Sequence, residues 1–132
     1  MSKKNKRHQF PAPVSGPAAI KQRGLQTFRQ NDFTSAIVQW SHLNLETEPA
    51  LRPALAEAHF RRALAVKDSA GRLADLQRAI ELAPSEGRFW YHLGLTHHHA
   101  DRLDEASAAY DRARETGFAR KHVGVRARPS GA

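Results

Sequence analysis

Apolar residues recur every three or four positions along most of the chain, which is the spacing of one face of an α-helix. The first such stripe consists of Ile20, Gly24 and Phe28, and the second of Phe33, Ala36, Ile37, Trp40 and Leu43. No segment alternates apolar and polar residues over the length of a strand. The pattern therefore predicts an all-α protein whose helices follow one another in pairs.

Turn signals separate the two helices of each predicted pair. Asn31 follows the first stripe and tolerates the left-handed conformation that ends a helix, and Asp101 stands after Ala100 at a similar place later in the chain. Gly117 is a natural residue just past a helix end. Gly24 and Gly94 are small enough to let two helix backbones cross closely. We expect the three pairs at about residues 17–49, 50–84 and 85–118.

The middle pair is the least regular of the three. Its first helix is expected from Pro53 to Lys67, where either Phe60 or Ala63 fills the close crossing. In its second helix, Arg72 stands where the other two pairs have an alanine. The register of the first helix in this pair stays open at this point.

A motif in the last pair is more specific than the helical periodicity. The chain reads Trp-x2-Leu-Gly-x2-His, then Ala-x3-Tyr, then Ala, through Trp90, Leu93, Gly94, His97, Ala106, Tyr110 and Ala113. This segment resembles the tetratricopeptide repeat, whose first helix is signed Trp-x2-Leu-Gly-x2-Tyr and whose second carries Ala-x3-aromatic. His97 takes the place of the family's tyrosine.

The resemblance extends to the spacing of the pairs. Trp40, Leu76 and Tyr110 follow one another at 36 and 34 residues, close to the ~34 of the family. It implies a right-handed α-solenoid of about three antiparallel helix pairs, the fewest that make such a stack stable. In it, Trp40 and Tyr110 are expected to fill the space between repeats, and Leu103 is expected to face inward.

Charge is concentrated at the two ends of the 132-residue chain. Residues 1–31 carry seven of the 21 Lys and Arg residues and residues 116–132 carry four, with no acidic residue in either range. The middle is therefore acidic, with ten basic against 13 acidic residues. We expect residues 1–16 to be a disordered basic, Pro-rich tail and residues 119–132 to be a basic tail. Either tail would solubilise the protein or contact nucleic acid.

Composition restricts the cellular compartment in which the protein is expected. The chain has no cysteine, so it forms no disulfide. No apolar run approaches the ~18 residues of a membrane span, and the N-terminal segment is too polar for a signal peptide. We expect a cytoplasmic protein with no membrane partner.

Four histidines invite a metal hypothesis: His92, His97, His98 and His99. Metal ligands on a helix need a spacing of three or four residues, whereas His92 precedes the other three by five, six and seven. We therefore expect no metal site and no cofactor. Because the chain has neither a nucleophile motif nor a Gly-rich phosphate loop, we expect no catalytic residues and no enzyme activity.

The tetratricopeptide resemblance implies a concave groove, lined by the first helix of each pair, that binds peptides. The groove residues would be Lys21, Leu25, Phe28, Arg29, Arg61, Arg88, Tyr91, His92, Leu95, His98 and His99, with Glu57 and Leu64 depending on the register. Such a surface suits a peptide with acidic and apolar residues. Some relatives clamp a carboxylate there with lysines, asparagines and an arginine. Only Lys21 and Arg88 match that set, since Leu25, Ala58 and His92 depart from it, and we do not expect chaperone binding.

Several alternatives stay open. The leading interpretation is a scaffold that binds a peptide or partner protein. The second is a nucleic-acid-associated protein that uses its basic ends. The third is a truncated piece of a longer array, because the residues after Gly117 offer little helix to cover the last pair. That uncovered face would bind a partner or support self-association.

Overall fold

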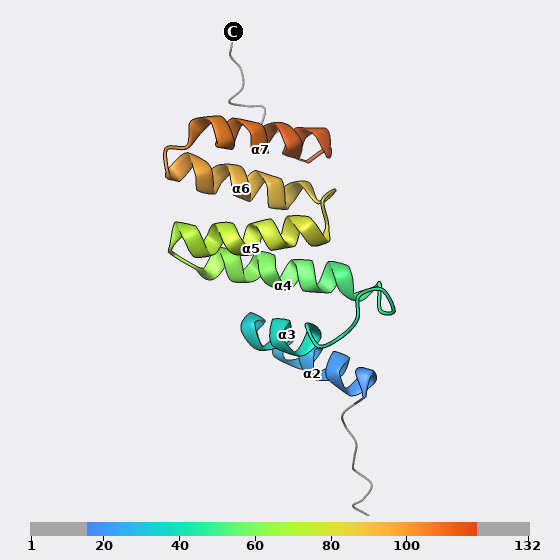
Figure 1. The fold of residues 1–132 in the computed structure, drawn as a ribbon. Helices are drawn as coiled ribbons and strands as arrows, with labels where there is room; N and C mark the ends of the chain where they lie inside the picture. Colours follow the sequence, from blue (N-terminus) through green and yellow to red (C-terminus); the bar gives the residue numbers. More distant parts are fainter. Residues whose placement is uncertain (1–15, 119–132) are drawn as a thin grey trace, which may run out of the picture. The chain divides into compact units, whose positions relative to one another are not determined.

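The structure is a computed structural model in which residues 16–118 are described. Its helices are α2 (Pro17–Arg29), α3 (Phe33–Trp40), α4 (Leu51–Ala65), α5 (Ser69–Leu82), α6 (Gly87–His99) and α7 (Leu103–Glu115) (Figure 1). Residues 16–118 contain no strand, so the all-α prediction is confirmed. The predicted tails lie outside the described residues, apart from Gly16.

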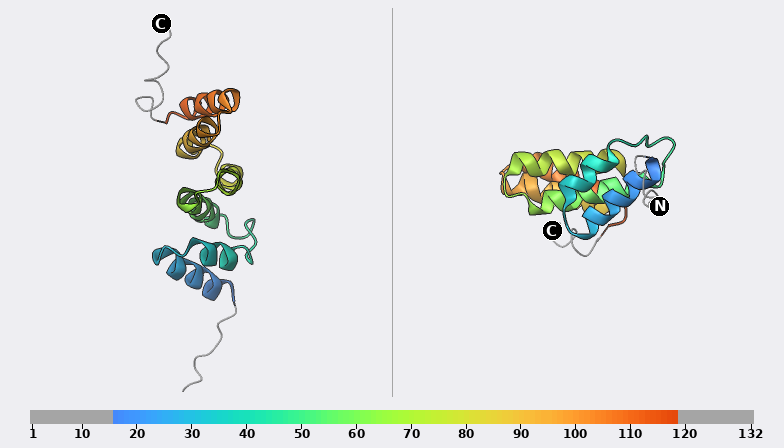
Figure 2. Two further views of the ribbon diagram at one scale, coloured as in Figure 1. Left: turned by 90° about the vertical axis from the view of Figure 1, so that its left-hand side faces the viewer. Right: turned by 90° about the horizontal axis from the view of Figure 1, so that it is seen from below.

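The chain divides into two compact units, the first ending at Leu51 and the second beginning at Arg52. In the first unit α2 packs against α3, and in the second α6 packs against both α5 and α7. The views in Figures 1 and 2 show α2 beside α3 and α6 beside α7, each pair running in opposite directions. Side-chain hydrogen bonds join α4 to α5 within the second unit. Helices that are neighbours in sequence are therefore neighbours in space inside each unit.

The α2–α3 and α6–α7 hairpins turn in the same way. Asn31 and Asp101 both have a left-handed backbone, with φ of 65° and 62°. The next residue then donates a backbone hydrogen bond back into the first helix, from Asp32 N to Thr27 O and from Arg102 N to His97 O, each 2.9 Å. The turns predicted at Asn31 and Asp101 are confirmed.

The close helix crossings predicted at Gly24 and Gly94 are also confirmed. A Cβ atom on Gly24 would collide with the indole of Trp40, and one on Gly94 would lie 2.5 Å from Cε1 of Tyr110. That Trp40 and Tyr110 also fill the space between repeats stays a prediction. Each ring lies over the glycine of its own hairpin, because the missing side chain there leaves the room that the ring occupies.

The α4–α5 connection is built differently. The side chain of Asp68 accepts a hydrogen bond from Gly71 N (3.0 Å) and so caps the start of α5. The Arg72 guanidinium, which replaces the expected alanine, donates to Val66 O at 3.2 and 2.7 Å and satisfies a carbonyl just beyond α4. Arg72 thus serves the connection rather than the close crossing.

Phe60 and Ala63 are both buried in α4, with 5% and 0% exposure. The ring of Phe60 lies 4.8 Å from that of Phe89 in α6. Phe60 therefore carries the packing between α4 and α6. Ala63 is the fully buried small residue of the two.

Three further predictions about the helices are wrong. The helix expected over Pro53–Lys67 begins earlier and ends earlier, at Leu51 and Ala65. Helix α3 ends at Trp40, so Leu43 lies in the following turn, where the Asn44 side chain accepts a hydrogen bond from Glu46 N and competes with helix continuation. Leu103 is 59% exposed instead of facing inward, because it is the first residue of α7, at the turn end of the hairpin.

Candidate functional site

The predicted groove residues are distributed over both units. Four lie in α2 of the first unit, one lies in α4 and six lie in α6 of the second unit. Within the second unit, the structure brings several of them together with residues that the sequence did not single out. Ala58, considered for a carboxylate clamp, is fully buried and contributes nothing to a surface.

The groove residues of the first unit are partly engaged in its own packing. The ring of Phe28 lies 5.3 Å from that of Phe33 and 5.9 Å from that of Trp40, so Phe28 belongs to the contact between α2 and α3. Lys21 forms an ion pair with Glu48 at 2.9 Å. Leu25 is half-buried, and Arg29 is exposed at the end of α2.

The cations predicted for the second unit are held by carboxylates. Arg88 pairs with Glu57 at 2.8 Å and with Glu86 at 2.9 Å, and Arg61 pairs with Glu57 at 2.9 Å. The Arg88 guanidinium also lies 5.1 Å from the ring centre of Phe60. Burial alone would raise the pKa of Glu57, but the two arginines lower it below the usual value. This part of the surface is therefore much less cationic than the sequence predicts.

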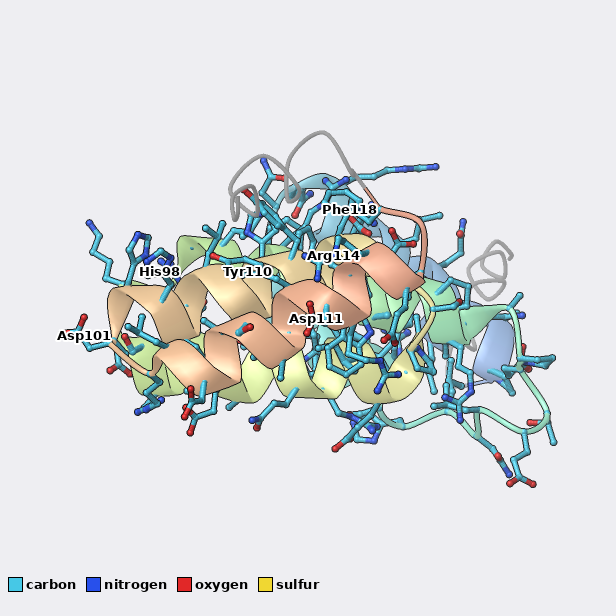
Figure 3. All side chains as sticks on the ribbon, turned by 90° about the horizontal axis from the view of Figure 1, so that it is seen from above. His98, Asp101, Tyr110, Asp111, Arg114 and Phe118 are labelled. Atoms are coloured by element: carbon cyan, nitrogen blue, oxygen red, sulfur yellow. The ribbon has the colours of Figure 1, made fainter. Side chains whose placement is uncertain are left out.

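Aromatic side chains gather on one side of the α6–α7 hairpin. The ring of Tyr91 lies 5.8 Å from that of Tyr110 and 5.5 Å from that of Phe118, and the Tyr110 hydroxyl lies 3.4 Å from Nδ1 of His98. Figure 3 shows His98, Tyr110 and Phe118 along the same side of the two helices. The three aromatic rings are half-buried, and His98 is exposed. We call Tyr91, His98, Tyr110 and Phe118 the aromatic face.

Tyr110 and Phe118 were not among the predicted groove residues. The sequence predicts Tyr110 as a core residue and Phe118 as the last residue of the third pair, directly before the basic tail at 119–132. The available signal was Gly117, which has φ of 85° and reverses the chain so that Phe118 N donates to Ala113 O at 3.0 Å. This reversal places the phenyl ring against Tyr91 and next to Gly87.

His92 borders the aromatic face and is half-buried. Its ring lies 5.1 Å from that of Phe60 and 5.5 Å from that of Tyr91. Burial lowers the pKa of His92 below its usual value, and the positive charges of Arg72 and Arg88 lower it further. The imidazole is accordingly neutral at physiological pH and acts as an aromatic ring with hydrogen-bonding nitrogens.

The remaining groove residues of α6 are Leu95, which is half-buried, and His99, which is exposed with its ring 6.3 Å from that of His98. The neighbouring His97 lines a separate crevice between α6 and α7, beside Trp90. Within residues 16–118, no three His, Asp or Glu side chains are arranged to hold a metal ion.

Comparisons with known proteins add no identity. No protein-family model matches the chain, and no curated protein sequence matches it significantly. None of the helices between residues 16 and 118 combines the length and apolar character that a membrane span requires.

Proposed function

We propose that the protein is a non-enzymatic, tetratricopeptide-like interaction module that binds a peptide segment or partner protein. In this proposal the helix pairs stack as an α-solenoid, and the first helices of the pairs line the binding surface. The single observation that carries the proposal is the aromatic face of α6–α7, because half-exposed aromatic residues gathered in one place are typical of binding surfaces.

Internal repetition supports the scaffold. Gly24 and Gly94 are 70 residues apart, as are Trp40 and Tyr110, and each glycine accommodates the corresponding ring. The left-handed turn residues share the same spacing. A 70-residue offset corresponds to two repeats of about 35 residues, close to the tetratricopeptide period.

The contacts refine the chemistry of the partner. Since Glu57 and Glu86 hold Arg88, the attraction for an acidic peptide is partly offset within the protein itself. The aromatic face offers rings, a phenol and an imidazole. We therefore propose that apolar or aromatic side chains anchor the partner segment, and that acidic residues contribute at the border near Arg88.

A second candidate function, binding of nucleic acid, rests on the charge of the chain ends. Residues 1–31 and 116–132 hold 11 Lys and Arg residues and no acid. Phosphate contacts weaken steeply as salt rises, roughly in proportion to the number of phosphates neutralised. Contacts to the aromatic face would depend less on salt, so a salt titration separates the two functions.

Selection from a peptide-display library with the full chain as bait would test the proposal. Selected peptides would be measured by fluorescence anisotropy against the wild type, Tyr91→Ser and the control Leu103→Ser, which removes an exposed apolar residue elsewhere on the hairpin. We expect Tyr91→Ser to weaken binding at least tenfold, about 1.4 kcal/mol, while the control binds as the wild type does.

Circular dichroism would establish that both variants remain folded. Enrichment of peptides that bind Tyr91→Ser as tightly as the wild type would reject the aromatic face as the site. Binding of single-stranded nucleic acid that disappears at high salt, without any selected peptide, would favour the second function.

A further inference from the structure

The three helix pairs carry different kinds of residues at one equivalent pair of positions, with one position on each helix. Counted from the residue that precedes the second helix of each pair (Asp32, Asp68 and Arg102), these positions carry Arg23 and Gln39, then His59 and Asp75, then Leu93 and Ala109. In every case the two residues are sixteen positions apart. They are in contact in the first two pairs and occupy the equivalent positions in the third.

Polar contacts fill this place in the first two pairs. Arg23 donates to Gln39 at 3.3 Å. His59 Nδ1 lies 3.0 Å from Asp75 Oδ1, and Arg62 adds two bonds of 2.9 Å to the same carboxylate. Long polar side chains thus cross from one helix to the other.

The third pair has apolar residues at these positions, and both are buried, with 8% exposure for Leu93 and 3% for Ala109. Leu93 and Ala109 carry no groups that reach across, and a crevice of about 510 Å³ lies between α6 and α7. Trp90 and the Arg112 guanidinium, 4.5 Å from the indole centre, form one end. Nδ1 of His97, which lines the crevice, is buried without a hydrogen-bond partner among the described residues. A bound peptide segment could cover such an apolar floor and supply the hydrogen bond that the His97 nitrogen lacks.

The charges at the rim restrict the occupant. Glu105 lines the crevice and stands with Asp104 in the first turn of α7. Arg112 is already held over Trp90 and paired with Glu115 at 3.3 Å. A segment with apolar side chains between basic residues would bury the former on Leu93 and Ala109 and pair the latter with the acidic end.

Residues 119–132 of the same chain have this chemistry. They contain Val123 and Val125 between basic residues and no acid; the basic residues are Arg120, Lys121, Arg126 and Arg128. The segment begins beside α6, because Phe118, which precedes it, packs on Tyr91 of that helix. Five extended residues span up to about 17 Å, which exceeds the roughly 10–12 Å diameter of a helix.

We propose that residues 119–132 fold back into the α6–α7 crevice of their own chain, with Val123 and Val125 on the apolar floor. A backbone N–H of the segment would donate to Nδ1 of His97. The segment would then contact both helices of the third pair, as the Arg23–Gln39 and His59–Asp75 contacts join the two helices of the first and second pairs. The crevice lies on a different face of α6 and α7 from the aromatic face, so the inference stands independently of the proposed function.

Paramagnetic relaxation in the full chain would test the proposal. Because the chain has no cysteine, Ser130→Cys provides a single attachment point for a nitroxide label at the end of the segment. Trp90 is one of two tryptophans in the chain, and its indole N–H signal reports on the crevice. We expect the label to remove most of the Trp90 signal, and chemical reduction of the nitroxide to restore it.

Matched variants make the result decisive. The labelled chain with Val123→Asp and Val125→Asp changes only residues outside the described fold, and it should restore the Trp90 signal. Ala127→Asp is the control with a similar charge change and should not. Glu105→Lys should restore the signal in part, through repulsion of the basic residues.

Two outcomes would overturn the proposal: an unaffected Trp90 signal, or loss that persists in the double valine variant. A mixture of nitroxide-labelled chains with isotope-enriched chains that carry no nitroxide tests whether the segment of one chain enters the crevice of another. Loss of the Trp90 signal in that mixture alone would assign the crevice to the segment of a second copy and reject occupancy within one chain.

Discussion

The α2–α3 and α6–α7 hairpins share one backbone arrangement but differ in how far their aromatic residues are exposed. Phe28 and Trp40 of the first hairpin correspond, 70 residues later, to His98 and Tyr110. Trp40 is only 3% exposed and packs on Phe28, whereas Tyr110 is half-buried and lies beside an exposed histidine. The same two positions carry two packed rings in one hairpin, and a half-buried ring beside an exposed histidine in the other.

The comparison shows that turn and crossing are separable from surface chemistry. Both hairpins keep a glycine under an aromatic ring and a left-handed residue at the turn. What differs is where the polar group of the ring finds its partner: the Trp40 indole N–H donates to Lys21 O at 3.3 Å inside the hairpin, whereas the Tyr110 hydroxyl lies 3.4 Å from Nδ1 of the exposed His98. A candidate site can therefore arise from a structural position by exchange of a few side chains.

The polar cluster of the middle pair should be the most sensitive place in the chain. Asp75→Ala would leave His59 and Arg62 without their carboxylate, and we expect a loss of about 3 kcal/mol in the free energy of unfolding. His59→Leu with Asp75→Ala, the combination found in the third pair, should cost clearly less than Asp75→Ala alone. Urea denaturation followed by circular dichroism would measure both. Equal losses would show that the cluster is not coupled.

The two crossings should respond unequally to an added methyl group. Gly24→Ala forces the buried Trp40 to move and should cost roughly 2–3 kcal/mol. Gly94→Ala should cost about 1 kcal/mol, because the half-exposed Tyr110 can swing outward. Gly71→Ala is the comparison with a milder contact, because its Cβ would lie 3.1 Å from the nearest atom, against 2.5 Å for Gly94→Ala. If Gly94→Ala proved the more damaging in denaturant titrations, the aromatic face would be a rigid part of the core.

Acidification should weaken the second unit before the carboxylates titrate. Burial lowers the pKa of His59 and of His92 below 6.5 in the folded protein. The hydrogen bond to Asp75 opposes this for His59, and Arg62 and Arg78 reinforce it. Because the unfolded chain takes up these protons at a higher pH, the free energy of unfolding should fall as the pH drops from about 7 to 5. His92→Gln should reduce that dependence, and an unchanged dependence would contradict the assignment for His92.

The smallest effects are expected at the turns. Asn31→Gly and Asp101→Gly relieve a left-handed backbone and should each stabilise the protein by up to about 1 kcal/mol. Asn31→Ala and Asp101→Ala should destabilise it by about 1 kcal/mol. Thermal unfolding of the four variants would show whether the two turns are energetically alike. Opposite signs for the two glycine variants would break the equivalence between the hairpins.

Local signals account for what could be predicted from the sequence. Gly24, Asn31 and Asp101 impose conformational requirements that depend on the residue itself, so they located the crossing and the turns correctly. The prediction that Leu103 faces inward is wrong because periodicity indicates the face of the helix on which a residue lies, but not how far the partner helix extends. The prediction that Leu43 belongs to the second helix is wrong because polar side chains after Trp40 end α3 early.

The candidate site was less accessible to prediction, because its properties depend on residues far apart in sequence. The charge of Arg88 is offset by Glu57, 31 residues away, and no spacing rule shows that pairing. Phe118 reaches Tyr91 through a chain reversal at Gly117, whose effect depends on where the chain goes next. The contact between His59 and Asp75 spans two helices in the same way.

The His59–Asp75 contact also constrains how this chain can change over generations. A relative that replaced the aspartate first would leave the half-buried Arg62 without its counter-charge and the buried His59 ring without its hydrogen-bond partner, and one that replaced the histidine first would lose a bond to a buried carboxylate. Either single step is costly, while the finished Leu–Ala combination is already tolerated at the matching place one pair later. Descendants of this sequence should therefore exchange the two residues together, or keep both.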